Sequence, residues 1–146
     1  MGSHAMEVCD VPTMLFVNLA VADVSRSRAF YTGLGVRFDA LFCDEGTLCF
    51  AVNDNCRVLL HREERFAGYV AGEIADLRSG REAVVAVSAA SRAAVDRCAD
   101  AALEQGGTLL RSPEDLGFMY SRSFCDLDGH AWEIVWMDPS QIPSDD

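Results

Sequence analysis

The sequence predicts an α+β domain in which two βαβββ repeats form a concave half-barrel sheet with helices on the outer faces. Three observations lead to this expectation. Two segments with a helical pattern, 23–35 and 91–107, each follow a run of strand-forming residues. Each helical segment ends in glycines and is followed by further short strand patterns. Neither half could bury both faces of a sheet alone, so the two sheets are expected to lie side by side and to leave a concave inner face.

The first half reads as strand, helix and three strands. "MLFVNLAV" (14–21) is rich in strand-forming residues, and Asp23 or Ser25 can cap the helix that follows. Three strands are then expected in "VRFDALFCD", "TLCFAVND" and "CRVLLHR", separated by turn-forming "DEG" and "NDN". We therefore place the first module at 14–61. Residues 62–80 form a linker whose beginning is compatible with a short helix.

The second half repeats this order. "EAVVAVSA" (82–89) is a strand, and "SRAAVDRCADAALEQGG" (91–107) carries an apolar stripe at helical spacing. "TLLR" is a short strand, and "GFMYSRSFCD" with "AWEIVWMD" forms a hairpin around "LDGH". The second module is therefore 81–139, followed by a polar tail at 140–146. The first six residues, "MGSHAM", resemble the remnant of an expression tag.

Composition excludes several classes of partner. A formal net charge of −11 and a pI near 4.5 argue against nucleic acid and anionic membranes, which select basic surfaces. No apolar run is long enough to span a bilayer, and no signal peptide is visible. The six cysteines form no CxxC pair, so we expect reduced thiols in a cytoplasmic protein.

Strand alternation predicts which side chains face the concave side. On the last strand, Trp132, Ile134 and Trp136 suit packing against helices, which directs Glu133 inward. An unpaired buried carboxylate is costly, so Glu133 needs a partner or a function.

The remaining inward positions follow from the hairpin and the first strand. A hairpin closed through Asp128-Gly129 would pair Phe124 with Glu133. On the first strand, Val17, Leu19 and Val21 suit the helix side. The expected ligand-binding wall is therefore Phe16, Asn18, Tyr120, Arg122, Phe124 and Glu133.

Several of these residues have a purely structural alternative. Glu133 is either a pocket carboxylate or half of an ion pair with Arg122. His61 is either a ligand or general base, or a strand-end histidine near solvent. Tyr120 and Arg122 could serve cross-strand packing, and Phe16 and Phe124 could be ordinary core. His130 is expected to be an exposed turn residue.

The duplicated pattern resembles the vicinal oxygen chelate superfamily, which includes glyoxalase I, bleomycin-resistance proteins and extradiol dioxygenases. The segments that carry the resemblance are "VNLAVADVSRSRAFYTGLGV" and "SFCDLDGHAWEIVWMDP". The second is similar to the family's D-P-D-G-x-x-x-E hairpin, with Leu127 in place of proline. The resemblance covers residues 14 to 139 and implies the half-barrel fold, a small-molecule ligand and a homodimer with its cavity near the subunit interface.

The resemblance also implies where a divalent metal would bind. The last-strand ligand matches Glu133, but the first-strand ligand falls on Phe16. The fourth-strand ligand falls near Leu60, beside His61, and that of the second half's first strand falls within 83–87, where no side chain can ligate. Glu133 and His61 are thus the only metal candidates, whereas a stable site needs three or more protein ligands.

Two hypotheses about function follow. In the first, the protein binds a small aromatic or cationic molecule in a dimer cavity and needs no cofactor. In the second, it is a metal-dependent lyase, isomerase or dioxygenase that uses Glu133. The sequence identifies no catalytic residue, and an occluded, non-binding fold is a third possibility.

Overall fold

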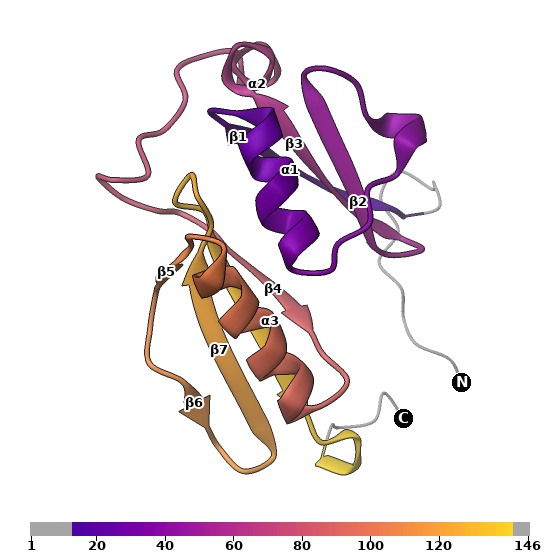
Figure 1. Cartoon of the computed structure of the whole chain (residues 1–146), viewed down its shortest axis with the longest axis vertical. Helices are drawn as coiled ribbons and strands as arrows, with labels where there is room; N and C mark the ends of the chain where they lie inside the picture. The colour runs from indigo at the N-terminus through magenta and orange to yellow at the C-terminus, as the bar shows by residue number, and fades with distance from the viewer. Residues whose placement is uncertain (1–12, 142–146) are drawn as a thin grey trace.

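The structure, a computed structural model, describes residues 13–141 and contains two open sheets and three α-helices (Figure 1). The predicted tag remnant at 1–6, Cys9 and residues 142–146 of the predicted tail lie outside the described residues. The α+β prediction is confirmed. Within the described part of the chain, no helix is both long and apolar enough to cross a membrane.

The first module consists of β1 (Leu15–Val21), α1 (Val24–Gly33), β2 (Thr47–Asn53) and β3 (Cys56–Arg62). Its sheet has the order β1-β3-β2, in which β1 and β3 are parallel and β2 and β3 are antiparallel. Asp23 caps α1 by accepting a hydrogen bond from the backbone N–H of Arg26 at 3.1 Å.

The predicted strand at 36–44 is wrong. That segment contains a short 3₁₀ helix, Ala40–Phe42, and only two isolated bridges, Phe38 to Phe50 and Asp44 to Thr47. The reason is local, because the Asp39 carboxylate accepts a hydrogen bond from the Leu41 N–H at 3.1 Å. Such a bond offers the backbone an alternative to a sheet ladder.

The second module follows the same plan. It contains β4 (Val84–Ser88), α3 (Arg92–Glu104), β5 (Thr108–Leu109), β6 (Glu114–Asp115), β7 (Met119–Cys125) and β8 (Ala131–Met137). Its sheet has the order β4-β8-β7-β5, and β6 also pairs with β7. β4 and β8 are parallel as β1 and β3 are, so the internal repeat is present in the topology.

Between the modules, α2 (Glu63–Val70) follows β3 directly and lies at the end of the first sheet (Figure 1). Residues 71–83, which follow α2, contain no helix or strand. A second short 3₁₀ helix, Pro139–Gln141, ends the described chain.

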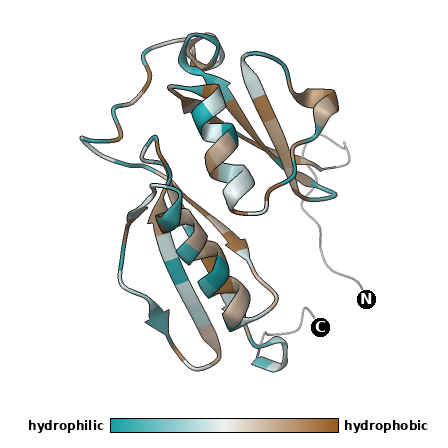
Figure 2. Ribbon diagram, viewed as in Figure 1, coloured by the Kyte–Doolittle hydropathy of each residue, from teal (hydrophilic) through white to brown (hydrophobic). Residues whose placement is uncertain are grey.

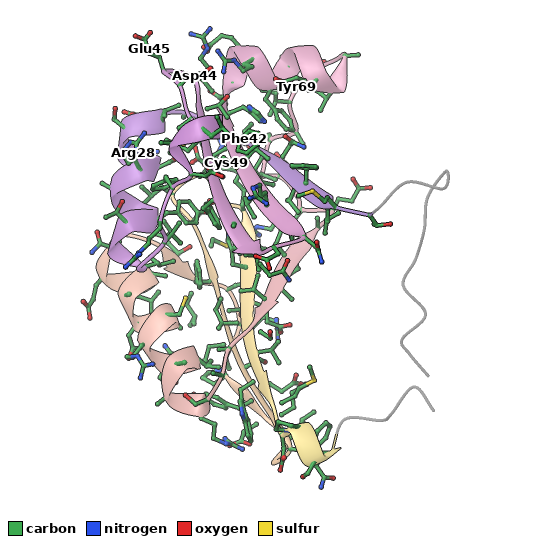
Figure 3. The ribbon with its side chains drawn as sticks, turned by 90° about the vertical axis from the view of Figure 1, so that its right-hand side faces the viewer. Arg28, Phe42, Asp44, Glu45, Cys49 and Tyr69 are labelled. Carbon is green, nitrogen blue, oxygen red and sulfur yellow. The ribbon has the colours of Figure 1, made fainter. Side chains whose placement is uncertain are left out.

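One helix layer covers one face of both sheets. In the edge-on view, α1 and α3 lie on one side of the strands (Figure 3). Their ribbons alternate hydrophilic and hydrophobic residues, as expected of helices with one buried face (Figure 2). The shared core draws residues from both modules: Val21, Phe30, Tyr31, Leu48, Phe50, Val58, Leu60, Val95, Ala102, Phe124, Trp132 and Ile134. We call the opposite side of each sheet its open face.

Several hydrogen bonds join the modules at the β7–β8 turn. The Tyr31 hydroxyl donates to Asp126 at 2.5 Å, and both residues are buried. The backbone N–H of Ala22 donates to the Asp128 carboxylate at 2.8 Å. His130 Nε2 lies 2.7 Å from the carbonyl oxygen of Ala20. His130 is therefore part of this joint rather than an exposed turn residue.

Candidate functional site

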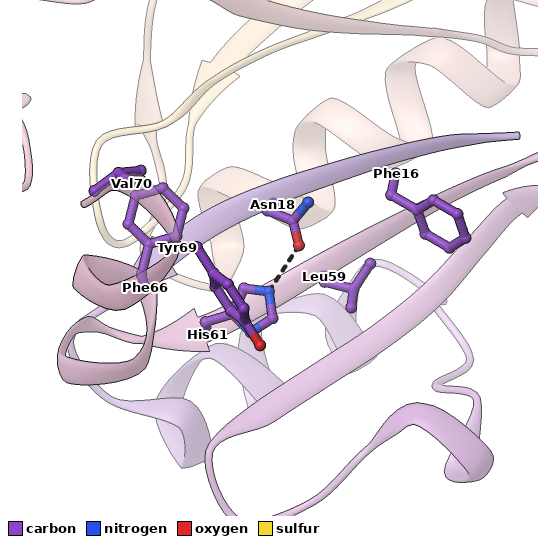
Figure 4. A pocket seen from close by; sticks show the side chains of 7 residues that line it. All are labelled: Phe16, Asn18, Leu59, His61, Phe66, Tyr69 and Val70. Carbon is purple, nitrogen blue, oxygen red and sulfur yellow. Dashed lines mark hydrogen bonds between the residues drawn. The ribbon is translucent and has the colours of Figure 1, made fainter. Parts of the chain in front are cut away.

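A cleft of about 670 Å³ lies between α2 and the open face of the first sheet. β1 and β3 form its floor and α2 forms a wall (Figure 4). Its volume is typical of sites for small organic molecules. The lining residues are mostly apolar or aromatic: Phe16, Asn18, Leu59, His61, Phe66, Tyr69 and Val70.

Strand alternation places two of the predicted residues in this cleft. Val17, Leu19 and Val21 pack against the core, so Phe16 and Asn18 project from the open face as predicted. Phe16 is 48 % exposed, so the alternative that it is ordinary core is wrong.

His61 lies in the floor of the cleft and is buried, so it is not the solvent-exposed strand-end residue considered as an alternative. Its Nδ1 is 2.9 Å from Thr47 Oγ1, and its Nε2 is 2.8 Å from Asn18 Oδ1. The Tyr69 ring stacks obliquely on the imidazole, with ring centroids 4.8 Å apart (Figure 4). Both ring nitrogens of His61 are thus already engaged.

Arg65 extends this hydrogen-bond chain to the surface. Its Nη1 donates to Thr47 Oγ1 at 2.7 Å and to Asp44 Oδ1 at 2.8 Å. The backbone N–H of Gly46 and the Arg65 guanidinium hold the pKa of Asp44 below its usual range. The arrangement attaches α2 to the β2 end of the sheet, where Asp44 and Tyr69 are seen in Figure 3.

Burial lowers the pKa of His61 below its ordinary value of 6.5, and the Arg65 charge adds to this effect against a smaller opposing effect of Asp44. The unfolded chain therefore binds a proton at His61 more readily than the folded chain does. We expect the contribution of His61 to stability to be complete above about pH 6.5 and to be lost as pH falls toward its folded pKa. Urea unfolding between pH 5 and 8 measures this. A His61→Gln variant should lose that part of the pH dependence, and an unchanged profile would contradict the assignment.

Three predicted wall residues lie on the other side of the second sheet. The predicted pairing of Phe124 with Glu133 is wrong, because Ser123 pairs with Glu133 and Phe124 pairs with Trp132. A shift of one residue moves alternate side chains to the opposite face. Phe124 is consequently 1 % exposed in the core.

Tyr120 and Arg122 follow the same shift and contact α3. The Tyr120 hydroxyl donates to Asp96 at 2.6 Å. Arg122 pairs with Asp96 at 3.2 Å and with Asp100 at 2.8 Å. Both residues therefore attach α3 to the sheet, and neither lines the cleft.

Glu133 projects from the open face of the second sheet, as predicted, opposite the core residues Trp132 and Ile134. Its ion-pair partner is Arg111 rather than Arg122. The Glu133 side chain is 23 % exposed and is not among the residues that line the cleft. Glu133 and His61 thus belong to different sheets.

The repeat shows which residues occupy the positions equivalent to those of Glu133. Phe16 and Val84 each lie seven residues before the N-cap residue of the next helix, Asp23 and Ser91 respectively, which aligns the two modules. In this alignment the pair of Glu133 with Ala86 of β4 corresponds to the pair of Leu59 with Asn18. Leu59, not Leu60 or His61, is therefore the counterpart of Glu133. Val84 is likewise the counterpart of Phe16. Three of these four positions carry apolar side chains, which cannot ligate a metal. Among residues 13–141, no group of three or more His, Cys, Asp or Glu side chains could hold a metal ion.

The sequence reading missed the wall contributed by α2. Phe66, Tyr69 and Val70 are spaced three and four residues apart, which is the stripe of one helix face. That spacing is visible in the sequence and could have identified them. Arg111, which lies outside any strand, gave no such signal. The five cysteines in the described region, Cys43, Cys49, Cys56, Cys98 and Cys125, are unpaired thiols.

Comparison with known proteins connects this geometry to a family. The model of the Glyoxalase/Bleomycin resistance protein/Dioxygenase superfamily matches residues 13–134. No curated protein matches the chain. Among solved structures, the hypothetical protein SA1046 from S. aureus is similar with a TM-score of 0.73 at 22 % identity, covering 86 % of this chain and 94 % of its own.

Two further solved structures, of proteins named for an activity, share the fold. The fosfomycin resistance protein FosX from Mesorhizobium loti has a TM-score of 0.63 at 16 % identity, covering 92 % of this chain and 98 % of its own. Lactoylglutathione lyase from Agrobacterium tumefaciens has a TM-score of 0.61 at 15 % identity, covering 85 % and 92 %. At these identities the likeness concerns the fold alone.

Proposed function

Because the chain belongs to the glyoxalase/bleomycin resistance protein/dioxygenase superfamily, we propose that it binds a small organic molecule in the cleft beside α2, without a metal. The cleft lining is the observation that carries this proposal. Aromatic and aliphatic side chains surround one hydrogen-bonded polar pair, Asn18 and His61, and the Tyr69 hydroxyl adds a further polar group. A largely apolar pocket with a few fixed polar groups is the usual form of a small-molecule site.

The side chains at the positions where a metal would bind support a metal-free function. Phe16, Leu59 and Val84 occupy three of the four equivalent open-face positions, and the Glu133 carboxylate is neutralised by Arg111. One carboxylate is insufficient for a stable divalent site. The retained Glu133 on the open face favours a second candidate, a metal-dependent lyase, isomerase or dioxygenase, which would need ligands from another chain.

We further propose a homodimer in the cytoplasm. Large apolar side chains remain exposed on the open faces of both sheets, with Phe16 at 48 %, Val84 at 54 % and Met137 at 37 % exposure. A second copy that covers these faces would remove apolar surface from water and enclose the cleft. The unpaired cysteines are compatible with a reducing compartment.

Replacement of Phe16 by alanine is expected to weaken ligand binding about tenfold, because a stacking surface of the cleft is lost. Ligands come from a fragment screen of the full chain by NMR, and affinities are measured by titration. Phe118→Ala is the matched control, since Phe118 is 45 % exposed and lies outside the cleft.

The homodimer has its own test. Sedimentation equilibrium of the unmodified protein should give twice the mass of one chain.

Metal content separates the two candidate functions. Elemental analysis after dialysis against Mn, Fe, Ni and Zn should find less than stoichiometric metal. One tightly held ion per chain, lost in Glu133→Ala, would overturn the metal-free proposal. If the fragments that bind change no NMR chemical shift of Phe16, Asn18 or His61, the proposal that they bind in this cleft is wrong.

A further inference from the structure

The hydrogen-bond chain beneath the cleft has a direction, and that direction determines what the cleft offers to a ligand. We infer that Arg65 sets the direction of these hydrogen bonds so that Asn18 presents an N–H donor to the cleft. We also infer that the ligand is an uncharged aromatic molecule with an oxygen acceptor. A ketone or aldehyde on an aromatic ring has this chemistry. The inference rests on the proposed binding function.

The direction begins at Arg65, because a guanidinium group can only donate hydrogen bonds. Its Nη1 lies 2.7 Å from Thr47 Oγ1, so the threonine oxygen accepts there. The buried hydroxyl proton of Thr47 needs an acceptor of its own, and the one that the described residues place within reach is His61 Nδ1, at 2.9 Å. Nδ1 therefore acts as an acceptor.

A neutral imidazole that accepts at Nδ1 carries its proton on Nε2. This N–H donates to Asn18 Oδ1 at 2.8 Å, which fixes the orientation of the amide. The amide nitrogen of Asn18 then points away from His61 (Figure 4). Within residues 13–141 no group accepts a hydrogen bond from it, so this donor remains available to a ligand.

The charge of the ligand follows from the lining. None of the seven lining side chains is an acid, a lysine or an arginine. Arg65, which is linked to His61 through Thr47, is already paired with Asp44, and burial together with Arg65 lowers the pKa of His61, which keeps it neutral at pH 7. A charged ligand would lose hydration without gaining a counter-ion, which is unfavourable.

The rings in the cleft select for an aromatic ligand. Phe16 projects from β1, and Phe66 and Tyr69 descend from α2 on the other side (Figure 4). Aromatic side chains favour offset or edge-on packing against other rings. An aromatic plane between them, with its oxygen toward Asn18, accepts a hydrogen bond from the Asn18 amide.

Four naphthalene probes of similar size test the inference: 2-acetylnaphthalene, 2-ethylnaphthalene, 2-naphthoate and 2-naphthylmethylammonium. Affinities for the full chain are measured at pH 7.5 by NMR titration. We expect the ketone to bind about three- to tenfold more tightly than the hydrocarbon, which corresponds to one hydrogen bond. The two ions should bind at least about tenfold more weakly than the ketone.

Asn18→Asp should reduce the affinity for the ketone to that for the hydrocarbon, because the amide donor becomes an acceptor. Asn55→Asp, in the exposed β2–β3 turn, is the matched control and should leave all four affinities unchanged. Equal or tighter binding of either ion would overturn the ligand class and leave the proposed function intact. Failure of all four probes to bind would overturn both.

The role of Arg65 has an independent readout. Long-range ¹H–¹⁵N spectra distinguish the two imidazole tautomers, and His61 should be the Nε2–H form. Arg65→Met should introduce the Nδ1–H form, because Thr47 is then free to accept from His61. An Nδ1–H tautomer in the unmodified protein, or a spectrum unchanged in Arg65→Met, would overturn the assigned direction.

Discussion

Replacement of Phe124 by alanine is expected to lower the free energy of unfolding by about 3–5 kcal/mol. Phe124 is 1 % exposed, and its ring packs 6.3 Å from that of Phe30 in the core shared by both modules. The substitution removes a large buried surface and leaves a cavity. Urea unfolding followed by tryptophan fluorescence measures the change.

Phe16→Ala is the control for this prediction, since it removes the same atoms from a side chain that is 48 % exposed. Its free energy of unfolding should change by about 0.5 kcal/mol or less. The comparison tests the β7–β8 register directly. If Phe124→Ala were as mild as Phe16→Ala, Phe124 would face the open side, and the pairing of Ser123 with Glu133 would be wrong.

Replacement of Asp126 by alanine is the second large effect, with an expected loss of about 3 kcal/mol. The buried Asp126 carboxylate accepts from the Tyr31 hydroxyl and from the backbone N–H groups of Asp128 and His130. Burial and the Asp126 charge both raise the pKa of Tyr31, so its hydroxyl stays protonated and keeps donating. Loss of the Asp126 carboxylate leaves these buried donors without an acceptor.

Asp76→Ala provides the comparison, because Asp76 makes a similar turn with Arg78 and Ser79 at the exposed surface. We expect a change below about 1 kcal/mol for that variant. Thermal unfolding monitored separately for each module is the measurement. An Asp126→Ala protein as stable as Asp76→Ala would mean that the turn does not hold the two halves together.

Periodicity predicted most elements because it depends only on which side of a strand or helix is apolar. Trp132, Ile134 and Trp136 share one face of β8, and their hydrophobicity alone directs Glu133 to the other. The same reasoning placed Phe16 and Asn18 correctly. These predictions need no knowledge of any partner strand.

The β7–β8 register could not be obtained in this way, because it depends on the length of the turn. A two-residue turn at Asp128-Gly129 would pair Phe124 with Glu133. The Asp126 carboxylate instead gathers the N–H groups of Asp128 and His130, and the ladder closes at Cys125 and Ala131. A single side chain thus lengthens the loop to an odd number of residues, which reverses the faces of β7.

The cleft was only half predictable for a similar reason. Its floor comes from strand alternation, whereas its wall depends on where α2 lies after β3. That position is set by contacts between segments far apart in sequence, such as Arg65 with Asp44 and Thr47. Composition and spacing indicate a helix face at Phe66, Tyr69 and Val70 but not the surface it approaches.

The joint at the β7–β8 turn and the cleft beside α2 share no residue, and this separation has an evolutionary consequence. Substitutions at exposed positions such as Phe16 leave the contacts of Tyr31, Asp126 and His130 intact. Descendants of one ancestor can therefore exchange one ligand chemistry for another while inheriting the same architecture. Substitutions in the cleft can therefore change ligand specificity with little loss of stability, which makes the cleft a favourable starting point for directed evolution.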